Sequence, residues 1–102
     1  MQITKLKGNS GIIVKDLLLI TPNIKEDKRG YFYEAWNQNL FKSKINFFGD
    51  FNQDNISFSS KGTIRGLHYQ IRPKGQSKLV SCLDGSIYDV AVDLRKNSDT
   101  FG

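Results

Sequence analysis

Residues 78–94 read KLVSCLDGSIYDVAVDL, and they carry the strongest local signal for the fold. Asp84-Gly85 is a turn dipeptide between two apolar, partly β-branched runs, which predicts an antiparallel hairpin with a two-residue loop. That register pairs Val80 with Asp89 and makes Lys78 and Asp89 diagonal neighbours on one face. An ammonium and a carboxylate among apolar side chains indicate either a functional site or a face open to water.

Short strand-like runs separated by turn residues recur through the rest of the chain. Asn37 is predicted to cap one short helix near 37–45, in which Leu40, Phe41 and Ile45 share a face. We therefore expect one all-β domain over residues 1–102, an antiparallel sandwich or barrel with one helix. The further strands are expected at residues 12–20, 31–36, 51–59 and 63–70, with turns at 21–23, 28–30 and 60–62.

Composition limits the chain to one small domain. A chain of 102 residues buries only about 60–65% of its unfolded surface. Cys82 is the only cysteine, which excludes an internal disulfide and favours a reducing compartment. The N-terminus has no signal-peptide pattern, and the longest apolar run is too short to span a bilayer. We therefore expect a cytoplasmic protein without membrane association.

The chain is basic, with 15 Lys and Arg against 10 Asp and Glu and a net charge of +5. This balance favours an anionic partner such as a nucleotide, a phosphate or a nucleic acid. The lysines form no run, so solvated surface lysines are the simpler interpretation. Tyr31, Phe32, Tyr33 and Trp36 are able to stack on a single-stranded nucleic acid. They alternate as a buried strand does, and we therefore expect no nucleic-acid partner.

His68, in the stretch TIRGLHYQ at residues 63–70, is the single histidine. Imidazole is the side chain most easily tuned to move protons near neutral pH. The alternative is a strand histidine that only packs. Arg65 lies three positions earlier, so an ideal strand points the two side chains to opposite faces. Gly66 between them permits a bulge that would bring both toward one site.

Six short segments of the chain occur in a distinctive order. They are residues 27–34 (DKRGYFYE), 53–57 (QDNIS), 65–70 (RGLHYQ), 75–80 (GQSKLV), 89–96 (DVAVDLRK) and 98–102 (SDTFG). In this order and spacing they resemble the dTDP-4-dehydrorhamnose 3,5-epimerase family, the cupin-fold epimerases of nucleotide-activated deoxysugars. The resemblance extends from near Gly11 to Gly102. It implies a cupin, or jelly-roll, antiparallel β-sandwich of which this chain is the incomplete N-terminal part.

The resemblance also implies roles for the matching positions. His68 matches the catalytic base, Lys78 matches a residue that holds the developing negative charge, and Asp89 matches a carboxylate near the floor of the active site. In the family, some nucleotide-binding residues reach the neighbouring subunit, which implies a homodimer. The positions that match substrate- and nucleotide-binding residues are Arg29, Glu34, Gln53, Asp54, Asn55 and Arg65.

The implied reaction inverts C3 and C5 of dTDP-4-dehydro-6-deoxyglucose to give dTDP-4-dehydro-L-rhamnose, for rhamnose and polysaccharide biosynthesis. Protons at both carbons are acidic because either carbanion delocalises into the 4-keto group. A neutral imidazole can remove such a proton while a nearby cation stabilises the enolate oxygen. This chemistry needs no cofactor. We expect no metal, because His68 alone cannot build a site of several histidines.

Family members continue beyond the Thr-Phe-Gly segment that ends this chain. There they carry a tyrosine that acts as the acid, a further histidine in a Phe-Ala-His-Gly-Phe-like segment, and an aspartate that pairs with the base. Three interpretations follow. The chain is the N-terminal piece of a longer enzyme, which we favour, or a short relative that completes its sandwich with another chain. The third is a sugar-nucleotide-binding protein without catalysis.

Overall fold

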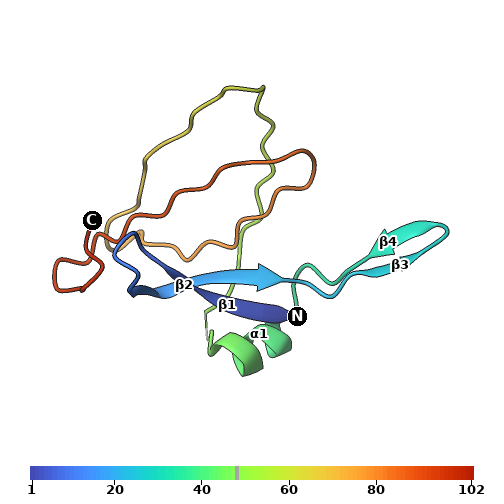
Figure 1. The fold of residues 1–102 in the computed structure, drawn as a ribbon, viewed down its shortest axis with the longest axis horizontal. Helices are drawn as coiled ribbons and strands as arrows, with labels where there is room; N and C mark the ends of the chain where they lie inside the picture. Colours follow the sequence, from blue (N-terminus) through green and yellow to red (C-terminus); the bar gives the residue numbers. More distant parts are fainter. Residues whose placement is uncertain (48) are drawn as a thin grey trace. The chain divides into compact units, whose positions relative to one another are not determined.

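The computed structural model describes residues 1–47 and 49–102. Its elements are β1 (Gln2–Lys7), β2 (Ile13–Thr21), β3 (Lys25–Asp27), β4 (Gly30–Phe32) and α1 (Gln38–Ile45), drawn in Figure 1. The described chain divides into two compact units. The first unit is Met1–Phe48 with Ile87–Gly102, and the second is Gly49–Ser86. The structure is therefore all-β with one short helix, built from small antiparallel sheets.

β1 and β2 form an antiparallel pair in the first unit. Gln2 pairs with Thr21, and the ladder continues regularly to Lys5 and Leu18. The next pair is Lys7 with Ile13, so β2 contains extra residues in a bulge opposite the end of β1. Asp16 in this bulge has a φ of 65°, a left-handed conformation that aspartate adopts more readily than most residues. The expected strand at 12–20 is confirmed, and its bulge is an addition.

β3 and β4 form a tight hairpin that extends away from the β1–β2 pair (Figure 1). Lys25 pairs with Phe32 and Asp27 with Gly30, which leaves Lys28 and Arg29 as the loop. The turn expected at residues 28–30 is confirmed. The strand expected at 31–36 ends at Phe32, because β3 supplies only three residues for it to pair with.

Helix α1 begins where its polar cap predicts. The Oδ1 atom of Asn37 accepts a hydrogen bond of 3.0 Å from the backbone N–H of Leu40, which satisfies one of the free donors of the first turn. Asn46 ends the helix with a φ of 56°, the left-handed conformation common at helix C-termini. The prediction of a helix near 37–45 with Asn37 as its cap is confirmed.

The apolar face of α1 holds the one large side chain that is buried in the described part of the chain. Phe41 is 3% exposed, and its ring lies 4.3 Å from that of Trp36. Leu40 and Ile45 are half-buried on the same side of the helix, as the spacing predicts. Phe47 approaches Trp36 edge-on at 6.4 Å. This aromatic cluster is the core of the first unit.

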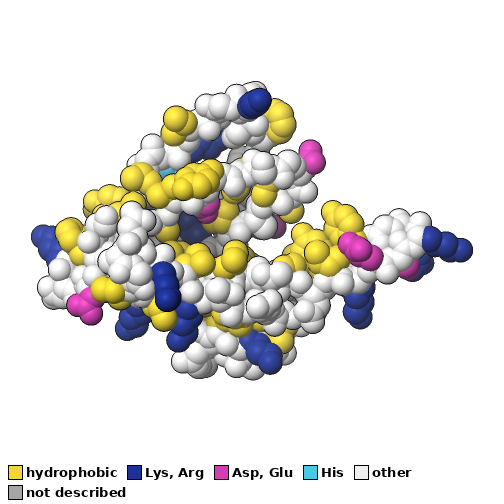
Figure 2. Space-filling model, in the orientation of Figure 1, with side chains coloured by type: hydrophobic (Ala, Val, Ile, Leu, Met, Phe, Trp, Pro, Cys, Tyr) yellow, Lys and Arg dark blue, Asp and Glu magenta, His cyan; other side chains and the backbone are white. Residues whose placement is uncertain are grey.

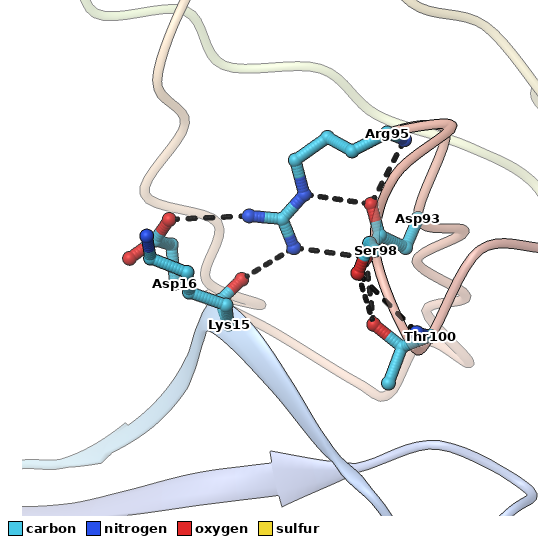
Figure 3. A network of polar contacts seen from close by, with 6 residues as sticks. All are labelled: Lys15, Asp16, Asp93, Arg95, Ser98 and Thr100. Atoms are coloured by element: carbon cyan, nitrogen blue, oxygen red, sulfur yellow. Dashed lines mark hydrogen bonds and ion pairs between the residues drawn. The ribbon is translucent and has the colours of Figure 1, made fainter.

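Asp93 organises the loop of residues 93–102. Its side chain is 3% exposed, and its carboxylate accepts hydrogen bonds from Arg95 Nε at 2.7 Å and from Ser98 Oγ and Thr100 Oγ1, both at 2.6 Å (Figure 3). The backbone closes around it, because the N–H of Gly102 donates to the Asp93 carbonyl oxygen at 2.8 Å. The bonds from Arg95, Ser98 and Thr100 hold the pKa of Asp93 far below its ordinary value.

Arg95 joins this loop to β2. Its Nη1 donates to Asp16 Oδ2 at 3.2 Å, and its Nη2 donates to the carbonyl oxygen of Lys15 at 2.9 Å. Both acceptors lie in the bulge of β2, so the irregular backbone presents a carboxylate and a carbonyl to one guanidinium (Figure 3). The nearby carboxylates raise the pKa of Arg95, with the larger effect from Asp93 and a smaller one from Asp16.

The hairpin expected from residues 78–94 is absent from the described structure, and this prediction was wrong. A type I′ loop needs positive φ at both central residues. Gly85 has a φ of 75°, but Asp84 is not among the residues with positive φ. The loop is therefore not a type I′ turn. The flanking runs do not pair, and the register that makes Lys78 and Asp89 neighbours does not form.

Residues 51–59 and 63–70 also form no strand in the described structure. The hydrogen bonds of this region are local, such as the turn bond of 3.1 Å from the N–H of Thr63 to the carbonyl oxygen of Ser60. Strands become stable when several pair and bury a shared face. Without such a layer, β-branched composition alone does not produce a ladder.

Large apolar side chains consequently remain exposed, and many are visible in yellow in Figure 2. Phe58, Ile64 and Tyr88 are 88%, 91% and 95% exposed. They lie in stretches with the composition of strands. Exposed apolar surface of this extent is typical of regions that pack against further polypeptide.

Asn37→Ala is expected to lower the free energy of unfolding by about 1 kcal/mol, because the substitution removes the cap of α1. Urea titration followed by far-ultraviolet circular dichroism would measure this change. Asn39→Ala, at an exposed helical position, is the matched control and should leave the midpoint nearly unchanged. Equal effects of the two substitutions would contradict the capping role of Asn37.

The Asp93 carboxylate is expected to contribute less to the free energy of unfolding in acid. Because its pKa is lower in the folded chain than the ordinary 3.8, the carboxylate contributes its full stability above about pH 4 and loses it as the pH falls toward the folded pKa. Urea midpoints at about pH 5 and about pH 2.5 should differ less in Asp93→Asn than in the wild type. Asp99→Asn, in the same loop, should retain the wild-type difference. An unaltered difference in Asp93→Asn would refute this origin of the acid sensitivity.

Candidate functional site

His68 lies on an exposed, irregular segment of the second unit. A Cβ added to Gly66 would lie 3.3 Å from the backbone nitrogen of His68 and 3.4 Å from its Cδ2. The imidazole therefore packs over the bare α-carbon of Gly66, whose φ is 111°. Gly66 thus interrupts the expected strand, and any larger residue there would displace the ring.

Arg65 is held by the segment that precedes it. Its Nε donates to Ser59 Oγ at 2.9 Å, and its Nη2 donates to the carbonyl oxygen of Phe58 at 3.1 Å. In the described structure no hydrogen bond joins Arg65 to His68. Gly66 has a positive φ, but no strand forms in this described segment that could contain the expected bulge.

Lys78 and Asp89 are both exposed and belong to different units. Lys78 lies in the second unit with His68 and Arg65, whereas Asp89 lies in the first. Lys78 and Asp89 were expected to be diagonal neighbours on one face of the hairpin of residues 78–94, but this hairpin does not form. The structure therefore places Lys78, but not Asp89, in the same unit as the candidate base.

Gln53, Asp54 and Asn55 form an exposed segment of the second unit. The amide nitrogen Nε2 of Gln53 donates to Asn55 Oδ1 at 3.1 Å. This bond spans Asp54, so the two amide side chains fold toward each other around the carboxylate-bearing residue. The segment offers a carboxylate and two amides, groups that can hydrogen-bond a nucleoside.

Arg29 and Glu34 lie in the first unit, and each already has a partner there. Arg29, in the hairpin loop, pairs through Nη2 with Oδ2 of Asp27 at the end of β3, at 2.7 Å. This pair lowers the pKa of Asp27 and raises that of Arg29. Glu34 Oε2 accepts a bond of 3.1 Å from Asn37 Nδ2, and therefore supports the cap of α1. Glu34 also lines an open hollow with Phe32 and other residues.

The polar network around Asp93 was not anticipated from the sequence. Its residues lie within two segments that carry the family resemblance, residues 89–96 and 98–102. The available signal was the spacing of Asp93, Arg95, Ser98 and Thr100, which places polar side chains at short intervals in one loop. Their role in the structure is to fix the backbone of this loop.

Among the described residues, no group of three His, Cys, Asp or Glu side chains lies close enough to hold a metal ion. Helix α1 has eight residues, well short of the length that crosses a membrane. In the described part of the chain, no helix is long and apolar enough to do so.

The family model for dTDP-4-dehydrorhamnose 3,5-epimerase matches residues 12–102. This match covers most of the chain, and it includes the exposed His68 segment and the Asp93 network. The chain belongs to the dTDP-4-dehydrorhamnose 3,5-epimerase family.

Individual relatives agree with this membership. The chain is 48% identical over 89 residues to the dTDP-4-dehydrorhamnose 3,5-epimerase of Shigella flexneri, covering 87% of this chain and 49% of the relative. It is 46% identical to that of Escherichia coli K12, covering 87% and 48%. With that of Methanothermobacter thermautotrophicus the identity is 51%, over 83% of this chain and 45% of the relative.

The chain spans about half the length of the curated relatives that it matches. No solved structure matches it.

Gly66→Ala is expected to move the imidazole of His68, because the new Cβ would meet its backbone nitrogen and Cδ2 at 3.3 and 3.4 Å. Since His68 is the single histidine, its ring protons give isolated nuclear magnetic resonance signals that report the change directly. Gly75→Ala is the matched control, because no atom lies within 4 Å of its added Cβ. Identical ring signals in wild type and Gly66→Ala would exclude this contact.

Proposed function

We propose that this chain carries the proton-abstracting part of a dTDP-4-dehydrorhamnose 3,5-epimerase. In this proposal, His68 removes the protons at C3 and C5 of dTDP-4-dehydro-6-deoxyglucose, and the product is dTDP-4-dehydro-L-rhamnose. The observation that carries the proposal is the family match over residues 12–102, because the chain's only imidazole lies within it.

The residues have the chemistry that this reaction needs. Removal of a proton next to the 4-keto group leaves an enolate, and the ammonium of Lys78 is suited to stabilise its oxygen. Inversion then requires a proton from the opposite face of the sugar. The family resemblance assigns that step to a tyrosine beyond the Thr-Phe-Gly segment, with Asp89 near the floor of the site.

The remaining matched positions serve the nucleotide in this proposal. Arg65 grips the diphosphate with its fork of donors, and the segment 53–55 lines the thymidine site. Arg29 and Glu34 contribute from the neighbouring subunit of a homodimer. For Arg29 this requires exchange of its exposed pair with Asp27, which costs little because exposed ion pairs are weak.

In this proposal the protein acts in the cytoplasm, and its complete domain is a cupin sandwich. The exposed apolar side chains support it, since Phe58, Ile64 and Tyr88 lie in stretches with strand composition. Pairing with further strands would bury them and enclose His68 in the water-poor site that enolate stabilisation favours.

A second candidate is a cupin fragment that binds a sugar nucleotide but does not catalyse the reaction, and that needs a partner chain. The local support of Arg65 by Ser59 and Phe58, together with the exposure of His68, favours it for the chain acting alone. Titration with dTDP separates this candidate from a chain that neither binds the nucleotide nor catalyses the reaction.

Deuterium incorporation from solvent at C3 and C5 of the keto sugar tests the proposal. His68→Ala should reduce the exchange rate by at least about 100-fold, the usual contribution of a general base. Lys78→Ala should also slow exchange, whereas Lys74→Ala, on the exposed loop nearby, should not. Exchange that is unaffected by His68→Ala would reject the assigned base. Saturable dTDP binding without exchange would instead select the second candidate.

A further inference from the structure

We propose that Ser59 is a positioning residue for Arg65, and that together they present one edge of the guanidinium to the diphosphate of the sugar nucleotide. This inference rests on the proposed function, because it concerns the ligand of the same site. Nothing in the comparisons assigns a role to Ser59.

Two hydrogen bonds orient the guanidinium plane. Arg65 Nε donates to Ser59 Oγ at 2.9 Å and Nη2 donates to the carbonyl oxygen of Phe58 at 3.1 Å. Because Nε and Nη2 share one edge of the guanidinium, the two acceptors, which belong to consecutive residues, both engage that edge. A planar group held at two points cannot rotate freely about its terminal bonds.

A turn brings the two partners together. The N–H of Thr63 donates to the carbonyl oxygen of Ser60 at 3.1 Å, which closes a four-residue turn between Ser59 and Arg65. Gly62 is its third residue and has a φ of 85°, the conformation that a type II turn requires there. The support of Arg65 is therefore local and needs no other part of the chain.

The bonds that remain are suited to an anion. A guanidinium has five N–H donors, and in the described structure two of them are used by Ser59 and Phe58. Three are left, two on Nη1 and one on Nη2, and one N–H from each of these nitrogens forms a parallel pair. That pair matches the spacing of two oxygens on a phosphate group. Because the arginine is already oriented, less side-chain entropy is lost when the anion binds.

Equilibrium titration of the purified chain with dTDP, and in parallel with thymidine, tests the binding role. Ser59→Ala should weaken dTDP binding by about three- to tenfold, the range for loss of one hydrogen bond, and leave thymidine binding unchanged. Ser59→Thr keeps the hydroxyl and should restore affinity. Ser60→Ala is the matched control, because that residue contributes its carbonyl oxygen to the turn. Equal dTDP affinities for Ser59→Ala and Ser60→Ala would overturn the inference.

The nuclear magnetic resonance signal of the Arg65 Nε–H, assigned with Arg65→Lys, tests positioning without any ligand. Ser59→Ala should shift it and speed its exchange with water, whereas Ser60→Ala should not. An unchanged signal in Ser59→Ala would overturn the positioning role. A wild-type chain that fails to bind dTDP would overturn the proposed binding function, while this signal still decides whether Ser59 orients Arg65.

Discussion

The polar network of Asp93 and Arg95 is the interaction on which the arrangement of the first unit depends. Arg95 bonds at once to Asp93 and to Lys15 and Asp16 in the bulge of β2. Isolated exposed ion pairs contribute little, but Asp93 is almost fully covered and receives three side-chain donors. Shared partners in fixed geometry make such a network more effective than its separate pairs. The bulge is therefore the feature that connects β2 to residues 93–102.

This dependence on polar contacts follows from how little apolar surface is buried. Phe41 is the buried core residue of the described chain, and its aromatic cluster with Trp36 and Phe47 is small. Small domains have thin margins of stability even with a complete core. Caps, turns and the Arg95 network consequently determine the local conformation, which explains why each of the two units is held by contacts of its own.

The features predicted correctly from the sequence are those with local causes. Asn37 predicts the start of α1 because the cap and the N–H that donates to it lie three residues apart, and the β3–β4 loop follows from the turn residues at 28–30. The hairpin at 78–94 failed because a ladder depends on neighbouring strands that sequence composition cannot supply. The Asp93 network was missed because loop side chains follow no helical or strand period. For the same reason, membership of an epimerase family could be predicted from ordered motifs, whereas the packing around the motifs could not.

The two halves of the proposed site differ in the same way. Arg65 is oriented by Ser59 and Phe58, a few residues away, so the proposed anion-binding part forms from local contacts. His68 packs over the α-carbon of Gly66 and is exposed to solvent. Enolate formation gains most from a water-poor surrounding, which local contacts cannot provide. Under the proposed function, nucleotide recognition rests on short segments of this chain, whereas proton transfer depends on packing that covers its exposed apolar side chains.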